Sequence, residues 1–168
     1  EHVADDPGAT EAAVTAAVAE AELLLTVGGI SAGERDHVAG ALAALGGEAV
    51  LRGAAIQPGK PITAVRMPAA GGGGEGREGG EGGDRLALCL PGNPVSCLAC
   101  ACLFAWPLLA RRLGATPPPW RRVPLVAPVR PNRRREAFRP AVRTGEGVSV
   151  PPWAGSGDLA HAAPTAGL

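Results

Sequence analysis

The sequence predicts an α/β domain followed by the start of a small all-β domain, and three observations lead to this prediction. Short, continuous apolar runs at 23–27 and 85–90 have the length and composition of buried strands. Helix-forming segments precede and follow the first run, so helix and strand alternate as they do in largely parallel sheets. Beyond Thr116 the helical period disappears, and short stretches typical of β structure follow.

Two helices are predicted in the first part of the chain. Residues 9–22 contain strong helix formers and no helix breaker. Within 34–47, the apolar residues Val38, Leu42 and Leu45 recur at helical spacing, and two glycines follow as a stop signal.

The remaining elements of the first part are two extended stretches and one long helix. Residues 48–56 and 61–67 are predicted to be extended, and 90–114 to form a turn and then a long apolar helix that Pro107 kinks. The glycine-rich segment 71–83 does not match a phosphate loop, because no strand ends into it and no Lys-Ser/Thr pair closes it. We expect it to be a disordered insertion between two strands.

The chain length and one proline-rich segment predict the domain organisation. With 168 residues, the chain suffices for one ordinary domain and part of another. The sequence ATPPPW is typical of a stiff linker, so we place a boundary near Thr116. The expected parts are a partial α/β domain at 1–115 and a partial β domain at 116–168.

Composition argues against several classes of protein. There is no run of about 18 apolar residues and no basic-then-apolar start, so neither a transmembrane helix nor a signal peptide is expected. The net charge is zero, but it is polarised: up to Ala110 there are six basic and thirteen acidic residues, and after it ten and three. A basic tail can suit an anionic partner, yet charge alone favours a solvated, arginine-rich surface over nucleic-acid binding.

The cysteines do not have the spacing of a metal site. There are four, and they lie at Cys89, Cys97, Cys100 and Cys102. A zinc site would need a second pair or histidines at ligand spacing, and the sequence has neither. We expect these residues to be small hydrophobes with free thiols, which suits a reducing cytosol.

Unusual residues are concentrated in three loops, and two of these follow the predicted buried strands directly. The loops are VGGISAGERD after Val27, QPGKP at 57–61, and LPGNPVS after the strand at 85–90. Open α/β sheets bind ligands at the carboxyl ends of their strands. In the third loop, Asn93 is a good N-cap and Pro94 fits the first helical position, so the helix start can attract an anion. Any one loop alone is explained as well by a simple turn.

The three loops in this order closely resemble motifs of the MoeA / gephyrin E-domain family, the molybdenum insertases, whose usual patterns are SGG-(I/V)-S-x-G-x-x-D, KPGKP and LPGNPVS. Two later segments, NRRREAFRPAV and GSGDLAHAAPTAGL, resemble further family signatures. The resemblance covers about Leu23 to Leu168, and PGNPVSCL is closer to eukaryotic members than to most bacterial ones.

The resemblance implies a fold and an activity. The chain would hold the C-terminal half of a MogA-like three-layer α/β/α domain, which binds the pterin, and the start of a small β-barrel. Family members insert molybdate into adenylylated molybdopterin and release AMP, using a divalent cation, usually magnesium. They are cytoplasmic homodimers, and a molybdopterin adenylyltransferase can be fused or separate. The resemblance implies neither a nucleic-acid partner nor insertion into a membrane.

The resemblance also implies roles for individual residues. Asp36 matches the aspartate that holds the cation, and Lys60 is the second expected catalytic residue. Lys60, Pro61 and Arg134 match the molybdate-binding positions. The remaining matches are expected to bind molybdopterin and its phosphate: Gly28, Gly29, Ser31, Gly33, Gly59, Pro91, Gly92, Asn93, Pro94 and Ser96.

Lys60 is the only lysine in the chain, among sixteen basic residues. Molybdate and phosphate are compact anions, and an ammonium is a compact point charge, whereas a guanidinium is a broad planar fork. A tight loop between Gly59 and Pro61 would then admit only lysine. The alternative is that one lysine survived in an arginine-rich composition by chance.

The sequence departs from the family pattern at three positions. Gln57 stands where the first lysine of KPGKP is common, and Ala160 and His161 stand where paired serines are usual. The family's opening strand is expected before Glu1, and the closing strands of the barrel after Leu168. Two alternatives therefore stay open: a gephyrin-like dimeric scaffold that binds a receptor peptide, and an inactive fragment. Peptide binding without cofactor formation would indicate the first, and failure to fold or to bind pterin the second.

Overall fold

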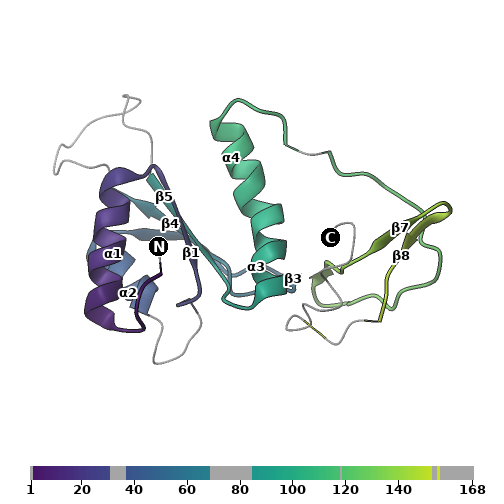
Figure 1. The fold of residues 1–168 in the computed structure, drawn as a ribbon, viewed down its shortest axis with the longest axis horizontal. Helices are drawn as coiled ribbons and strands as arrows, with labels where there is room; N and C mark the ends of the chain where they lie inside the picture. The colour runs from purple at the N-terminus through teal and green to yellow at the C-terminus, as the bar shows by residue number, and fades with distance from the viewer. Residues whose placement is uncertain (1, 31–36, 69–84, 118, 153–154, 156–168) are drawn as a thin grey trace. The chain divides into compact units, whose positions relative to one another are not determined.

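The computed structural model describes residues 2–30, 37–68, 85–117, 119–152 and 155 (Figure 1). The chain packs as two units. The first unit combines residues 1–53 with 61–91, and the second combines 54–60 with 92–168. These are units of packing, and the domain boundary expected near Thr116 stays a prediction. The insertion predicted at 71–83 lies outside the described residues.

The first unit is built on a four-stranded sheet with the strand order β1-β5-β4-β2. The strands are β1 (Leu23–Val27), β2 (Glu48–Arg52), β4 (Thr63–Met67) and β5 (Arg85–Leu90). Strands β1 and β5 have the bounds that the apolar runs predicted, and the α/β class is confirmed. The prediction that both strands are buried holds for β5 but is wrong for β1, where no residue is buried and Leu25 and Val27 are exposed. Strand β1 lies at the end of the strand order, so only β5 pairs with it among the described strands. Each of these two strands ends where a motif loop begins.

The prediction of a largely parallel sheet is wrong for the described strands. Strand β1 pairs with β5 in parallel, but the β5–β4 and β4–β2 pairs are antiparallel. The physical reason is the connection after β2: the chain returns without a helix, and Gly53 N donates to Ile62 O at 2.8 Å where it re-enters the sheet. A parallel pair would need a longer crossover connection.

Two helices, α1 (Pro7–Glu20) and α2 (His37–Ala44), pack on one face of this sheet (Figure 1). Asp6 caps α1 by accepting from Ala9 N at 2.8 Å, and a proline follows it, so the helix begins two residues before the predicted start. Every second residue of β4 and β5 faces these helices, as the alternation of side chains in a strand requires. The shared core is Val14, Ala41, Leu42, Val65, Met67, Ala87 and Cys89.

The second unit contains the predicted long helix, in three consecutive parts. They are α3 (Pro94–Cys100), the π-helical segment η1 (Ala101–Ala105) and α4 (Trp106–Arg112). Pro107 has no N–H to donate and crowds the carbonyl of Leu103. The π-helical segment ends at Ala105, two residues before this proline, so the predicted disturbance takes the form of a π segment.

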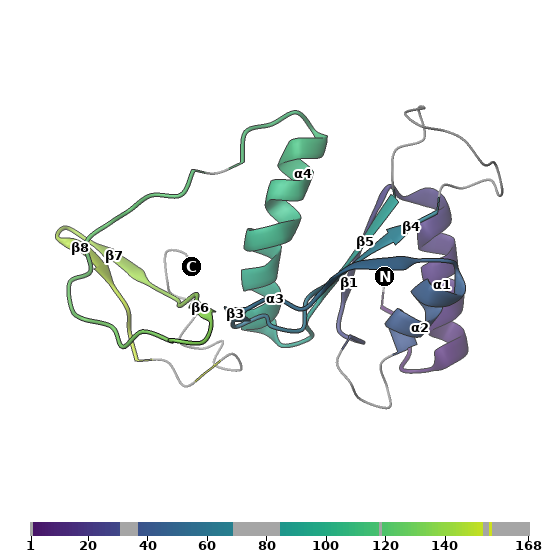
Figure 2. The ribbon, with the colours of Figure 1, turned by 180° about the vertical axis from the view of Figure 1, so that it is seen from behind.

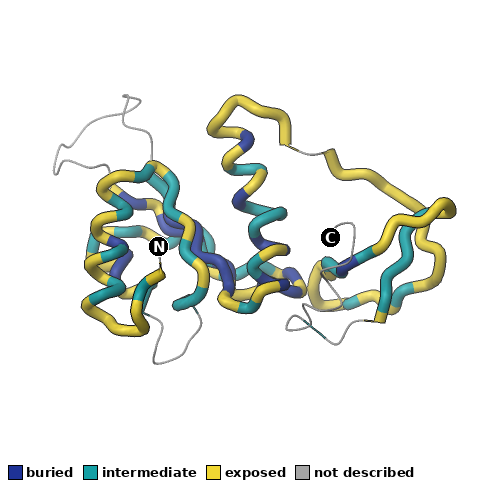
Figure 3. The backbone as a smooth tube through the Cα atoms, in the orientation of Figure 1, coloured by how far each residue is buried: buried dark blue, intermediate teal, exposed yellow. Residues whose placement is uncertain are grey.

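This helix also bears on the expectation that no segment spans a membrane. Residues Pro94–Arg112 form 19 helical residues with a mean hydropathy of 1.5, enough by length and composition alone to cross a bilayer. The expectation that no segment spans a membrane therefore stays a prediction. The finding is weak evidence for a membrane span, because the core helix of a soluble protein passes the same test. Figure 3 shows buried and exposed residues alternating along it.

The other described strands of the second unit are short. Strand β3 (Ile56–Gln57) pairs in parallel with β6 (Glu136–Ala137), beside the start of α3 (Figure 2). Strand β7 (Val142–Thr144) pairs with β8 (Gly147–Ser149) in a hairpin. The described residues after 114 form no helix, in agreement with the predicted change to β structure.

Candidate functional site

The first and third motif loops begin side by side at one edge of the first unit's sheet. Because β1 and β5 run parallel, Val27 pairs with Leu90 at their carboxyl ends. Directly beyond this pair, Gly28 N donates to Leu90 O at 2.9 Å. The structure thus brings Gly28 next to the start of the PGNPVS loop, at the position where open α/β sheets bind ligands.

Gly28 and Gly29 both have backbone angles that favour glycine, with φ of 86° and 66°. A Cβ on Gly29 would lie 2.7 Å from Cγ2 of Val38, which leaves no room for a side chain between the loop and α2. Three further residues predicted for this loop, Ser31, Gly33 and Asp36, lie outside the described residues.

The start of α3 has the predicted cap. Asn93 is the N-cap, and its Oδ1 accepts from Ser96 N at 3.5 Å, while Pro94 occupies the first turn. The backbone continues the helix, since Cys97 N donates to Asn93 O at 2.8 Å. Ser96 is buried, with 5% of its surface exposed. The other two predicted residues of this loop differ in exposure: Pro91 is buried and Gly92 exposed.

A hydrogen bond from Cys100 holds the buried part of the QPGKP loop. The Sγ of Cys100 donates to Gly59 O at 3.5 Å, and both residues are buried. Gly59 has a φ of 107°, and a Cβ there would lie 2.5 Å from that sulfur. Burial, and then the neighbouring Cys97, raises the pKa of Cys100 to about 12, so this group is a protonated donor at neutral pH. The contact leaves Lys60 and Pro61 exposed.

The segment that carries Arg134 forms hydrogen bonds with Gln57, the first residue of the same loop. Phe138 N donates to Gln57 O at 2.8 Å, and Asn132 Nδ2 donates to the side-chain oxygen Oε1 of Gln57. Asn132 Oδ1 accepts in turn from the backbone N–H groups of Arg134, at 2.9 Å, and Arg135, at 3.2 Å. Lys60 and Arg134, predicted to bind the same anion, therefore lie on two segments of the second unit that are bonded to each other.

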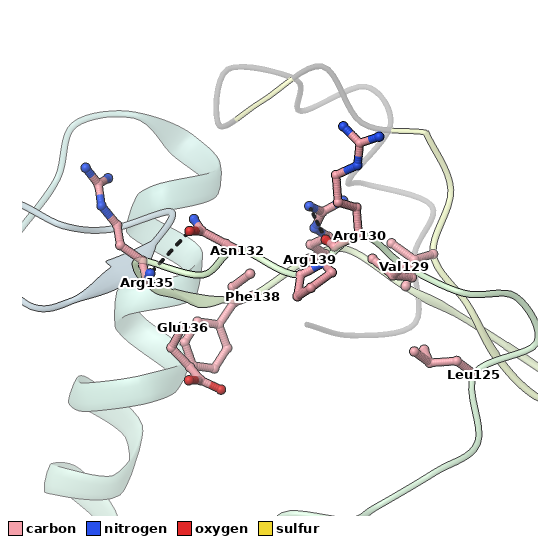
Figure 4. Close-up of a pocket in the computed structure, with 11 residues that line it drawn as sticks. Leu125, Val129, Arg130, Asn132, Arg135, Glu136, Phe138 and Arg139 are labelled. Carbon is pink, nitrogen blue, oxygen red and sulfur yellow. Dashed lines mark hydrogen bonds between the residues drawn. The ribbon is translucent and has the colours of Figure 1, made fainter.

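A pocket of about 430 Å³ adjoins this segment (Figure 4). Its lining combines apolar residues, among them Leu125, Val129 and Phe138, with polar ones, namely Asn132, Glu136 and three arginines. The arginines are Arg130, Arg135 and Arg139, whereas Arg134 does not line the pocket. In Figure 4, Arg130 and Arg139 extend to one side, while Phe138 and Glu136 point the opposite way.

Sequence reasoning missed the residues that hold the predicted ones in place. Cys100 was expected to be only a small hydrophobe, and Asn132 was not singled out. Nothing in the local sequence signals either contact, because Cys100 is 41 residues from Gly59 and Asn132 is 75 residues from Gln57. The run of arginines from 133 to 135 was a signal for cationic residues, but not for which one faces the pocket.

Each unit by itself contains groups suited to binding anions. The first unit offers backbone N–H groups at the glycine loop. The second offers the capped helix start, one exposed ammonium at Lys60 and several exposed guanidinium groups. Within the described ranges, no three His, Cys, Asp or Glu side chains are grouped as a metal site.

Comparison with known proteins places the chain in a family. Residues 1–111 match the model of the probable molybdopterin binding domain. The molybdopterin molybdenumtransferase of Nostoc sp. is 31% identical over 118 residues, which cover 70% of this chain and 24% of that protein. The enzyme of the same name from Synechococcus elongatus is 35% identical over 148 residues, 87% of this chain and 33% of that protein.

A solved structure shows the same fold. The MoeA molybdopterin biosynthesis protein from Pyrococcus horikosii superposes with a TM-score of 0.63 over 96% of this chain and 35% of that protein, at 24% identity. The chain thus spans a third or less of the length of the two curated relatives.

Proposed function

The chain belongs to the MoeA family of molybdopterin-binding proteins, and from that premise we propose that it supplies part of the active site of a molybdenum insertase. In this reaction molybdate is inserted into adenylylated molybdopterin, AMP is released, and the molybdenum cofactor results. Because the chain spans only 24% and 33% of the two relatives, the activity is proposed for the full-length protein that carries it.

The observation that carries the proposal is the junction of two motif loops at the sheet edge. The bond from Gly28 N to Leu90 O joins the glycine loop to the PGNPVS loop inside the segment that matches the molybdopterin-binding family. Backbone N–H groups of the glycine loop can bind the phosphate of the pterin there, and the capped start of α3 in the second unit offers further N–H groups for an anion. The glycines let the ligand approach the backbone closely.

Molybdate would be bound by the cationic residues of the second unit. Lys60 supplies a compact charge directly after the buried Pro58 and Gly59, and Arg134 supplies a second cation from the adjoining segment. Both substrates are anions, so they repel each other when they are bound close together. Fixed positive charges of the protein offset this repulsion. The chain's part in such chemistry is positioning and charge stabilisation, and no protein nucleophile is required.

The proposal includes a magnesium ion held by Asp36 against phosphate oxygens. Asp36 lies outside the described residues, so the structure offers no test of that fit. The mechanism proposed here uses only the anion-binding groups of the chain. We also propose that the full-length protein is a cytoplasmic homodimer that receives its substrate from a molybdopterin adenylyltransferase, fused or separate. These details are supported by the family resemblance.

The test is a reconstitution with the full-length protein. Purified protein is mixed with adenylylated molybdopterin, molybdate and magnesium, and both AMP and active molybdenum cofactor are measured over time. We expect AMP and cofactor in equal amounts, with cofactor formation dependent on molybdate. Binding of the pterin without turnover would indicate an inactive member of the family, and binding of a receptor peptide without cofactor formation a scaffold. Either result would reject the proposed reaction.

A further inference from the structure

We propose that Gln57 and Asn132 form a positioning pair that couples the Lys60 loop to the turn carrying Arg134, and thereby sets the affinity for the tetrahedral oxyanion substrate. We call this pair the Gln57–Asn132 clasp. The inference rests on the proposed function and deepens it. It gives Gln57, which departs from the family pattern, a role other than that of a missing charge.

The first step concerns the orientation of the Asn132 amide. Its Oδ1 accepts from Arg134 N at 2.9 Å and from Arg135 N at 3.2 Å. Backbone N–H groups are donors, so only the oxygen of the amide can face them. The NH2 group must then face Gln57, and the contact requires an acceptor on that side. Gln57 provides it with Oε1.

The second step concerns the link from Gln57 to Lys60. Only Pro58 and Gly59 separate the two residues, and both are buried. A proline fixes its own φ, and Gly59 is held by Cys100 with no space for a side chain. Since the intervening backbone is so constrained, a displacement of Gln57 is passed on to Lys60.

The third step concerns the other end of the clasp. The two bonds to Asn132 Oδ1 shape the turn in which Arg134 lies, because an asparagine that accepts from N–H groups two and three residues ahead defines a local turn. Strand pairing reinforces the junction, since Phe138 N donates to Gln57 O and Glu136 N to Ala55 O, each at 2.8 Å. One amide side chain thus joins both cation-bearing segments.

The numbers of hydrogen-bond donors and acceptors distinguish two explanations of Gln57: that it forms the clasp, or that it only lacks the positive charge of a lysine. A lysine at 57, as in the family pattern, would add a positive charge and would favour anion binding if charge alone mattered. In this chain it would set an ammonium, which only donates, against the Asn132 NH2 group. The clasp therefore predicts that Gln57→Lys weakens oxyanion binding.

The experiment is a double-mutant cycle in the full-length protein, with initial rates measured against molybdate concentration. Gln57→Ala and Asn132→Ala should each raise the KM for molybdate by roughly 2- to 12-fold, the range expected for one hydrogen bond of about 0.5–1.5 kcal/mol, with a smaller change in kcat. The double variant should be no worse than the poorer single variant. Gln57→Lys should also raise KM, and adding Asn132→Asp should restore it, because the carboxylate accepts from the ammonium at unchanged net charge.

Thr144→Ala is the matched control. Thr144 makes comparable exposed contacts in the β7–β8 hairpin, donating to Gly147 O at 3.2 Å and accepting from Glu146 N at 3.3 Å, so its loss should leave the KM for molybdate unchanged. Additive effects in the cycle, or a lower KM for Gln57→Lys, would overturn the clasp while leaving the insertase intact. If Asn132→Ala does not fold, the test is the KM for molybdate of Gln57→Lys, compared with that of the Gln57→Lys/Asn132→Asp double variant. An inactive wild type would instead reject the proposed function, and the clasp's role in substrate affinity with it.

Discussion

The two regions that carry the motif residues are built in different ways. At the sheet edge of the first unit, Gly28 and Leu90 meet because two adjacent strands run parallel and end together. In the second unit, the Lys60 loop is held by Cys100 and Asn132, which reach it from segments far along the chain. The first arrangement follows from strand pairing, whereas the second depends on individual side chains. Single substitutions should therefore disturb the second region more selectively.

The largest effect is expected at Lys60. Lys60→Ala and Lys60→Arg in the full-length protein should each lower the rate of cofactor formation by about 100-fold or more, the scale seen when a charge-stabilising group is removed. Arginine should fail despite its charge, because it is longer and planar, and the close packing at Gly59 and the fixed φ of Pro61 limit how far the backbone can shift to accommodate it. Initial rates at saturating pterin provide the measurement. A wild-type rate for Lys60→Arg would mean that the single lysine is an accident of composition.

A smaller but still large effect is expected at Gly59, measured as stability. Gly59→Ala should reduce the free energy of unfolding by about 3 kcal/mol, because its Cβ would meet the Cys100 sulfur at 2.5 Å and its φ is 107°. Denaturant titration followed by circular dichroism measures it.

Gly114→Ala is the control for that substitution. Gly114 has a φ of 65°, yet a Cβ added there would meet nothing within 4 Å, so only the backbone conformation is penalised and about 1 kcal/mol should be lost. If both substitutions lower the free energy of unfolding equally, the contact between Cys100 and Gly59 does not restrict the loop.

Sequence reasoning was most successful where structure is local or periodic. The apolar runs predicted β1 and β5 with their observed bounds, and the cap at Asn93 was recognised from the residue types around it. The direction of β4 was not recognised, because it depends on how the chain turns back after β2. Cys100 and Asn132 were missed since their partners are distant in sequence. Asp36 lies outside the described residues, so its role stays a prediction.

The smallest effect is expected at the helix start. Asn93→Ala should lower the free energy of unfolding by about 1 kcal/mol through loss of the N-cap, and Asp6→Ala should do the same at α1. The two variants should differ in function, because only Asn93 lies in a motif loop: its substitution should raise the KM for the pterin several-fold. If both variants keep a wild-type KM, the PGNPVS turn serves only to cap the helix.

The division of labour between the two regions is tested most directly by measuring the KM of both substrates for one variant in each. Gly29→Ala alters the glycine loop of the first unit, where a Cβ would meet Val38 at 2.7 Å, and Arg134→Ala removes a cation from the second. We expect Gly29→Ala to raise the KM for adenylylated molybdopterin and Arg134→Ala to raise that for molybdate, each by about 10-fold with the other KM nearly unchanged, the loss expected when about 1.4 kcal/mol of binding is removed. If both variants change the two constants equally, or if the effects are exchanged, the assignment of pterin to the first region and molybdate to the second is wrong.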